Sequence, residues 1–110
     1  MKQILSLNDT LEYINTGEPV LIYFSGENCA VCKVLKPKIE EAITQNFPKM
    51  HILEVQTELH KEITSHFTVF SIPTILVYFD TKEFFRFGRN ISIVSFIQDL
   101  KRPYNMLCED

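Results

Sequence analysis

The fold is decided by one stretch of the chain, Val20-Leu21-Ile22-Tyr23-Phe24-Ser25-Gly26-Glu27-Asn28-Cys29-Ala30-Val31-Cys32. The apolar residues that open it predict a buried strand, and residues 25–28 predict a turn. From about Cys29 to Asn46, apolar residues recur at helical spacing, which predicts a long helix. The members of its apolar face are Leu35, Ile39, Ala42 and Ile43.

Two cysteines three residues apart at the start of a helix are typical of thiol–disulfide exchange. Cys29 falls at the helix N-terminus, where unpaired backbone N–H groups and the positive end of the helix dipole favour a thiolate over a thiol. Cys32 follows one turn later on the same face, close enough to form and reopen a disulfide without large backbone movement. We therefore expect Cys29 to be the nucleophile and Cys32 the resolving cysteine.

Length and composition narrow the class of protein. The chain has 110 residues, 45% of them hydrophobic, so we expect one domain spanning residues 1–110. Acidic residues outnumber basic ones by 14 to 11 and no basic cluster alternates with aromatic residues, so nucleic acid is not an expected partner. We expect no membrane span and no signal peptide, because no apolar run is long enough. Three cysteines do not make the framework of a small secreted protein, and we expect a cytoplasmic location.

The segments on either side of the first strand and the dithiol helix predict further elements. A capping box at Ser6-Leu7-Asn8-Asp9 precedes a first helix that Gly17 ends. Residues 51–55 predict a second strand, and strand, helix and strand in this order imply parallel pairing. The first helix carries Leu7, Leu11 and Ile14, and a short helix after the second strand is marked by Leu59, Ile63 and Phe67.

The C-terminal third predicts a hairpin and a closing helix. Residues 75–79 form an apolar strand, and a turn at residues 80–82 leads to an antiparallel partner at residues 83–87. The closing helix has Ser92 as its N-cap and Pro103 after its end, and it carries Ile93, Phe96, Ile97 and Leu100 on one face. Together the elements predict an α/β fold with a mixed central sheet flanked by helices on both faces.

Two proline motifs complete the pattern. Pro37 stands five residues after Cys32, and Ile72-Pro73-Thr74 opens the third apolar strand. With the dithiol helix and the order of the elements, they make the chain resemble the thioredoxin family over nearly its full length. In that family a proline at the position of Pro37 bends the active-site helix. The resemblance also implies that Pro73 is cis and exposes the Ile72 backbone to a substrate strand, that Thr74 belongs to this segment, and that Gly88 matches a glycine that lets a partner chain approach.

Three departures set this chain apart from an ordinary member of that family. Asn28 stands where the family has a tryptophan before the first cysteine, and Ala30-Val31 replaces the usual Gly-Pro pair. Tyr23 occupies the position of a buried aspartate that handles the proton of the second thiol, and its phenol is neutral near pH 7. Glu54 stands where a neighbouring strand often has a lysine. Its carboxylate is a candidate proton acceptor for Cys32 if it faces the same cavity, and the alternative is that it faces solvent.

The resemblance implies a protein disulfide reductase or exchange protein that needs no organic cofactor or metal. Its substrates are proteins with disulfides, and its electrons come from a thioredoxin-reductase-type flavoenzyme. We expect a monomer. Loss of the tryptophan removes an apolar contact surface, which favours a specialised carrier that serves one dedicated partner over a general reductase.

Two other interpretations remain open at the level of sequence. The dithiol is half of a zinc site if Cys108 and the histidines complete it, although no second close pair of ligands follows. Alternatively the dithiol is vestigial and the fold serves as a binding module. Cys108 itself is expected to be an unreactive thiol in a short polar tail. The histidines in question are His51, His60 and His66.

Overall fold

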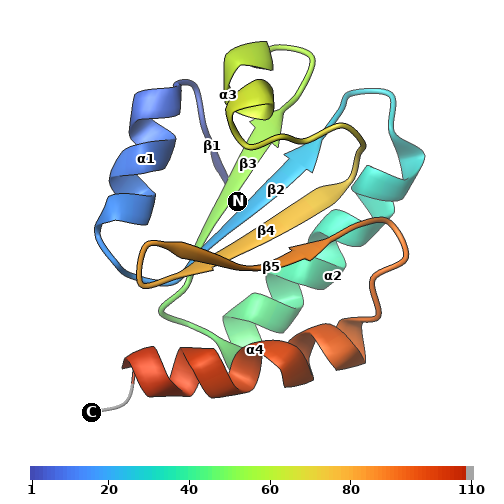
Figure 1. The fold of residues 1–110 in the computed structure, drawn as a ribbon. Coiled ribbons are helices and arrows are strands. Elements are labelled where there is room, and N and C mark those ends of the chain that lie inside the picture. Colours follow the sequence, from blue (N-terminus) through green and yellow to red (C-terminus); the bar gives the residue numbers. More distant parts are fainter. Residues whose placement is uncertain (109–110) are drawn as a thin grey trace.

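The computed structural model describes residues 1–108 and shows, within them, a five-stranded sheet with helices against both faces (Figure 1). The predicted α/β class is confirmed. In chain order the elements are β1 (Lys2–Gln3), α1 (Leu7–Asn15), β2 (Val20–Ser25), α2 (Ala30–Asn46), β3 (His51–Gln56), α3 (Lys61–His66), β4 (Thr74–Phe79), β5 (Lys82–Phe87) and α4 (Ile93–Cys108).

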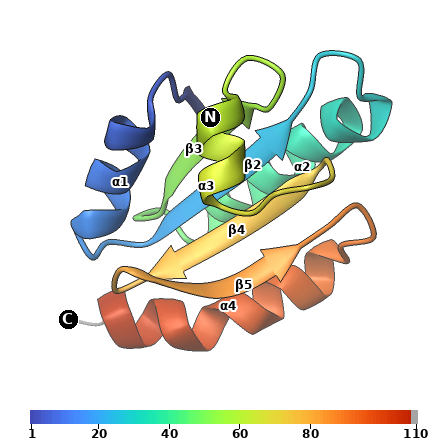
Figure 2. The ribbon, with the colours of Figure 1, turned by 45° about the horizontal axis from the view of Figure 1, so that its top comes forward.

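The sheet is mixed, with the strand order β1-β3-β2-β4-β5. As predicted, β2 pairs with β3 in parallel and β4 with β5 antiparallel, and β2 also pairs antiparallel with β4 (Figure 2). In this register Tyr23 lies beside Glu54 on one side and beside Ile75 on the other. Because β2 is the central strand, the turn that follows it places the dithiol between β3 and β4.

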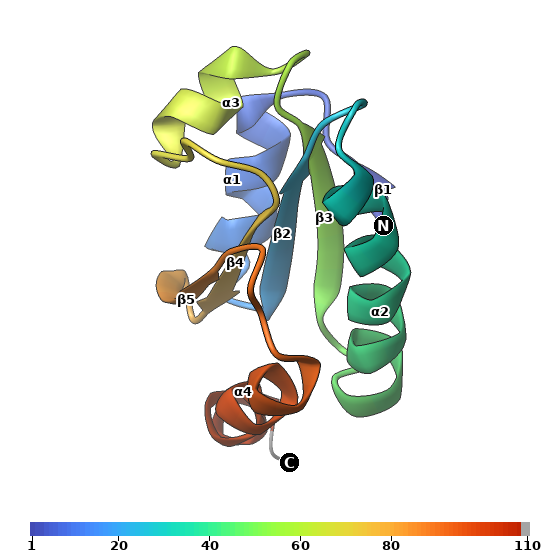
Figure 3. The ribbon, with the colours of Figure 1, turned by 90° about the vertical axis from the view of Figure 1, so that its right-hand side faces the viewer.

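Two apolar layers hold the helices on the sheet. Figure 3 shows α1 and α3 on one side of the sheet and α2 on the other. Side chains alternate along β2, so that Leu21 and Tyr23 pack toward α2 and α4, whereas Ile22 and Phe24 pack toward α1 and α3. Every residue of β2 is buried, which explains its continuous apolar sequence. The active-site strand is therefore fixed from both faces.

Local sequence signals position the ends of several elements as predicted. The Ser6 hydroxyl accepts a hydrogen bond from the Asp9 N–H at 3.1 Å and caps α1. Gly17, with φ +81°, adopts the left-handed conformation just after α1. Asp80 and Thr81 both have positive φ, as a two-residue turn between β4 and β5 requires.

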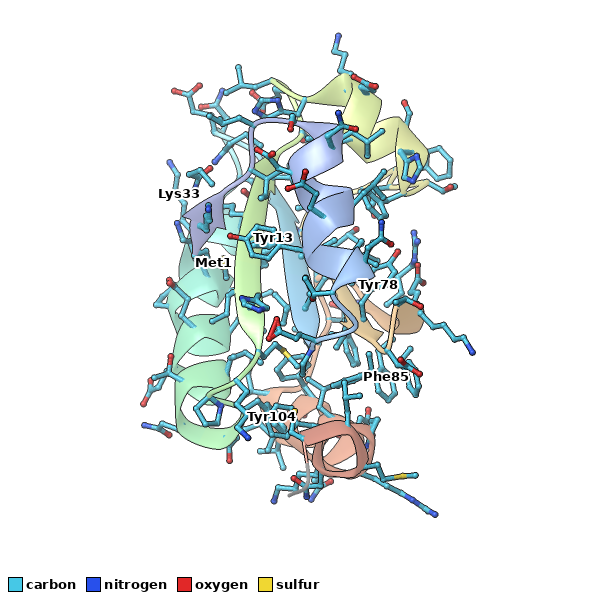
Figure 4. All side chains as sticks on the ribbon, turned by 90° about the vertical axis from the view of Figure 1, so that its left-hand side faces the viewer. Met1, Tyr13, Lys33, Tyr78, Phe85 and Tyr104 are labelled. Carbon is cyan, nitrogen blue, oxygen red and sulfur yellow. A yellow bond between two sulfur atoms is a disulfide. The ribbon has the colours of Figure 1, made fainter. Side chains whose placement is uncertain are left out.

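The prediction that Pro103 follows the last helix is wrong, because α4 continues through Pro103 to Cys108. The reason is tertiary packing: Tyr104, which is labelled in Figure 4, is buried. Its ring packs edge-on against Phe47 at a centroid distance of 5.0 Å. Its hydroxyl accepts a hydrogen bond from the Lys49 N–H at 3.0 Å. These contacts offset the backbone hydrogen bond that proline removes. Cys108, expected in a polar tail, is thus the last residue of a helix and is half-buried.

Two smaller differences concern the edges of the predicted elements. The short helix α3 begins at Lys61, so Leu59 precedes it and is 75% exposed instead of lying on its apolar face. The two-residue strand β1 was not expected, because two residues carry no periodicity. Its residue Gln3 pairs with Glu54 of β3.

Candidate active site

The dithiol sits at the first turn of α2, where Cys29 is the N-cap residue and forms a disulfide with Cys32. The two Cα atoms are 5.3 Å apart, and the Cys29 Sγ accepts a hydrogen bond from the Cys32 N–H at 3.2 Å. Cys29 is partly exposed, whereas only 2% of Cys32 is exposed. The backbone N–H groups of the first helical turn thus face the more accessible sulfur.

A cavity of about 500 Å³ opens beside the buried sulfur. It lies between the start of α2 and the ends of β2 and β3, and its walls carry charges of both signs. Glu54 and Cys32 line this same cavity. The lining residues are Ser25, Gly26, Glu27, Cys32, Lys33, Lys36, Glu54, Gln56, Glu58 and Leu59.

Glu54 is the buried acid of the cavity, with 3% of its surface exposed. Its carboxylate accepts hydrogen bonds from Lys36 Nζ at 2.7 Å, from Ser25 Oγ at 2.8 Å and from the Gln3 side-chain amide. Burial alone would raise the pKa of Glu54, but these hydrogen bonds outweigh it and lower the pKa below its ordinary value. A carboxylate with this many donors is ionised at neutral pH, and it lines the same cavity as Cys32.

Tyr23 takes the place of an acid directly behind the dithiol helix. It is fully buried, and its hydroxyl donates a hydrogen bond to the Cys32 carbonyl oxygen at 2.6 Å. Burial, together with the negative charge of Glu54, raises the pKa of Tyr23 to about 12. The phenol therefore stays protonated and holds the backbone of Cys32, and it is no base at neutral pH.

The segment before β4 faces the dithiol end of the sheet. The Ile72–Pro73 peptide bond is cis. Within residues 1–108, no hydrogen bond occupies the backbone N–H or C=O of Ile72. The Thr74 side chain is buried and donates to the Ser71 carbonyl oxygen at 2.6 Å, so it holds its own loop. A methyl group built on Gly88 would meet no atom within 4 Å, so the space beside this residue is open.

The histidines and carboxylates of residues 1–108 form no metal-binding group at the dithiol. Among the residues that the structure describes, no group of three or more His, Cys, Asp or Glu side chains is placed to hold a metal ion. His51 instead contacts Glu18 Oε2 at 3.1 Å and packs edge-on against Tyr13. Within the same residues, 1–108, no helix combines the length and apolar character needed to cross a membrane.

Comparison with known proteins agrees with this geometry. The family model described as Thioredoxin matches residues 4–101. The chain belongs to the thioredoxin family. It is 28% identical over 109 residues to the thioredoxin-like protein YdfQ of Bacillus subtilis, with 96% of each chain covered. It is 35% identical over 83 residues to the thioredoxin of Chlamydia trachomatis serovar D, covering 76% of this chain and 79% of the relative.

A solved structure supports the same family assignment. The solution structure of the oxidised thioredoxin from Plasmodium falciparum matches with a TM-score of 0.79 at 26% identity, covering 92% of this chain and 98% of that one. Membership of the thioredoxin family, together with Cys29 and Cys32 at disulfide distance, makes the protein a thiol–disulfide oxidoreductase that acts on disulfide substrates.

The sequence analysis did not predict the partners of Glu54. Lys36 could have been predicted to lie near Cys32, since it stands four residues after Cys32 and so shares a face of α2 with it. The position of Gln3 could not have been predicted, because its approach to Glu54 depends on the parallel pairing of β1 with β3.

Proposed function

We propose that this thioredoxin-family protein reduces or exchanges disulfides in protein substrates, with Cys29 as the nucleophile and Cys32 as the resolving cysteine. The observation that carries this proposal is the difference in access between the two sulfurs at the N-terminus of α2. An incoming disulfide reaches Cys29 first, and the helix terminus stabilises its thiolate.

The proposed reaction has two exchange steps. The Cys29 thiolate attacks one substrate sulfur, the substrate S–S bond breaks, and the other substrate sulfur leaves as a thiolate that takes a proton from water. Cys32 then loses its proton and attacks the Cys29 sulfur, which releases the first substrate sulfur as a thiolate and closes the Cys29–Cys32 disulfide. Two electrons pass from the dithiol to the substrate.

The loop before β4 is the proposed docking position for the substrate backbone. The Ile72 N–H and C=O are available to an extended segment, which would add beside the sulfurs as a strand adds to a sheet edge. Pro73 shapes this loop and Thr74 fixes it through Ser71. The open space at Gly88 leaves room for the same partner chain.

Glu54 is the proposed acceptor of the Cys32 proton. The two residues line one cavity, and the hydrogen bonds from Lys36, Ser25 and Gln3 keep the carboxylate in the ionised form that can accept a proton. Its lowered pKa makes it a weak base that passes the proton on readily, and the cavity is large enough to hold water for that transfer. Tyr23 stays protonated and supports the Cys32 backbone.

The reaction also needs an electron donor and a reducing compartment. A thioredoxin-reductase-type flavoenzyme is the proposed electron donor, the proposed compartment is the reducing cytoplasm, and the proposed working form is a monomer. A reducing compartment would return the protein to the dithiol form that the first step needs.

Reduction of insulin by dithiothreitol, followed by the precipitation of the freed chains, tests the proposal. Catalytic amounts of wild-type protein should accelerate precipitation, and Cys29→Ser should not. A wild-type rate equal to that of dithiothreitol alone would argue for a binding module instead, which would keep its partner after both cysteines were replaced.

A further inference from the structure

Phe70 is the most exposed large hydrophobic side chain among residues 1–108, with 90% of its surface in contact with solvent. It stands two residues before Ile72, in the loop between α3 and β4. Leu59, at 75% exposure, occupies the preceding loop between β3 and α3. Both loops lie at the end of the sheet where β2 leads into α2 (Figures 1 and 2).

Hydrogen bonds and a buried side chain hold the loop that carries the exposed Phe70. At the start of the loop, the Arg86 guanidinium donates to the carbonyl oxygens of Phe67 at 2.8 Å and Thr68 at 2.9 Å. Next to Phe70, the Val69 side chain is buried and its N–H donates to a carbonyl oxygen of α3. On the other side of Phe70, the Thr74 hydroxyl donates to the Ser71 carbonyl oxygen at 2.6 Å. The backbone that carries the ring is thus held before and after Phe70, which lowers the backbone entropy lost when a partner binds.

The same loop touches the dithiol site. A methyl group built on Gly26 would lie 2.7 Å from the Ile72 side chain and 2.5 Å from a Glu58 carboxylate oxygen, so these two side chains close over Gly26 from opposite loops. Gly26, Leu59 and Cys32 line one cavity. Phe70 lies within about 7 Å of Ile72 along the chain, since two residues span no more than that between Cα atoms.

We propose that Phe70, Leu59 and Ile72 form an apolar rim that selects disulfide-bearing proteins with apolar side chains next to the attacked cysteine. This inference rests on the proposed function. The occupant follows from the reaction: a mixed disulfide brings the partner cysteine within about 7 Å of Cys29, measured between Cα atoms, so its neighbouring residues must lie over the loops that surround the dithiol. Asn28 offers no apolar surface there, and Phe70 supplies one from a different loop.

Two synthetic peptides test the selection. Each consists of two identical chains joined by one disulfide, and the peptides differ only in having Leu or Ser on both sides of the cysteine. The second-order rate constant for reduction by the pre-reduced protein should be about tenfold higher for the Leu peptide, because one apolar side chain becomes buried on the rim.

Phe70→Ser should reduce this preference to less than about threefold while leaving the rate for the Ser peptide unchanged. Met106→Ser is the matched control, since Met106 is 72% exposed but lies in the last turn of α4, and it should keep the full preference. A wild-type protein without preference, an unchanged preference in Phe70→Ser, or an equal slowing of both peptides by Phe70→Ser would each overturn the proposal. Failure of the wild-type protein to reduce either peptide would instead overturn the proposed function.

Discussion

Two side-chain clusters on this sheet, each built around buried residues, differ in chemistry and in what they contribute. The polar cluster at the dithiol end consists of Glu54, Lys36, Ser25 and Gln3, and it borders the cavity that Cys32 lines. The aromatic cluster lies where α4 packs against β4 and β5, and its rings contact one another in series. Its members are Phe79, Phe84, Phe85, Phe87 and Phe96.

The aromatic cluster stabilises the fold simply by removing ring surface from water, with Phe96 and Phe79 almost fully buried. Burying the Glu54 carboxylate has an unfavourable desolvation energy, which is offset only because three side chains donate to it. Replacing a buried ion pair by apolar residues of similar volume often costs no stability. Stability of the fold is therefore a poor explanation for the buried charge of Glu54, and a role in the reaction is a better one. We therefore expect the aromatic cluster to contribute mainly to stability, and the polar cluster to serve the proposed proton transfer from Cys32. Substitutions in the two clusters should then affect different measurements.

The largest expected effect is on stability, in the aromatic cluster. Phe96→Ala should lower the free energy of unfolding by about 3–5 kcal/mol, because it leaves a cavity under Phe87 where a fully buried ring stood. Val94→Ala, at an exposed position of the same helix, should change it by less than about 0.5 kcal/mol. Urea unfolding measures both. The separation of roles would fail if the folded Phe96→Ala protein reduced disulfides more than about tenfold more slowly, since Phe96 lies on α4 and the two sulfurs lie at the first turn of α2.

A smaller loss of stability is expected from Lys36→Met in the polar cluster. It leaves the buried Glu54 carboxylate with one donor fewer and should lower the free energy of unfolding by about 1–3 kcal/mol, a range that allows for the partial exposure of Lys36. The double variant with Glu54→Gln should recover part of this loss, because no unpaired charge remains. Urea unfolding of the two single variants and the double variant gives the interaction energy, and strictly additive losses would mean that the pair does not interact.

The next effect is kinetic and concerns the second step alone. Glu54→Gln should slow the release of reduced substrate about tenfold, less than a well-tuned general base provides, and should leave the initial attack by Cys29 unchanged. Single-turnover kinetics separates the two steps. Faster release would contradict the role of Glu54 as acceptor, because it would mean that the unpaired charge of Lys36 stabilises the Cys32 thiolate and that water takes the proton.

The smallest effect is a pH dependence of stability. A carboxyl group whose pKa is lower in the folded state contributes stability above its unfolded pKa, and this contribution is lost as the pH falls through the folded pKa. Since the pKa of Glu54 is lowered, the difference in unfolding free energy between wild type and Glu54→Gln should stay constant from pH 7 to about pH 5 and change in favour of the variant below that. Denaturation curves that remain parallel down to about pH 3 would contradict this linkage.

The sequence predicts those elements that are determined by residues close together in the chain, and it fails for those that depend on distant contacts. The buried strand β2, the capped helix α1 and the dithiol helix all follow from periodicity and end signals within a few residues of each other. The extension of α4 past Pro103 does not, because Tyr104 contacts Phe47 and Lys49 more than fifty residues away. Local propensity predicts a stop there, and tertiary packing prevents it.

The active site divides in the same way. Cys29 and Cys32 are recognisable from their spacing, and the place of Glu54 beside Tyr23 could be inferred from strand order. The position of Lys36 on the Cys32 face of α2 could also be inferred from its spacing, but its hydrogen bond to Glu54 depends on how α2 packs on β3, which the sequence does not show. The exposure of Phe70 was also unpredictable, since an isolated aromatic residue in a loop is as compatible with the core as with the surface.

The central claim is that Cys29 attacks and Cys32 resolves, and trapping the mixed disulfide tests it most directly. Pre-reduced Cys32→Ser protein, mixed with a disulfide-bonded substrate such as insulin, should form a covalent adduct that peptide mapping by mass spectrometry places on Cys29. Cys29→Ser should form no comparable adduct under the same conditions, because its remaining dithiol sulfur is buried. Equal trapping on Cys32 in the Cys29→Ser protein, or no adduct on Cys29, would contradict the account.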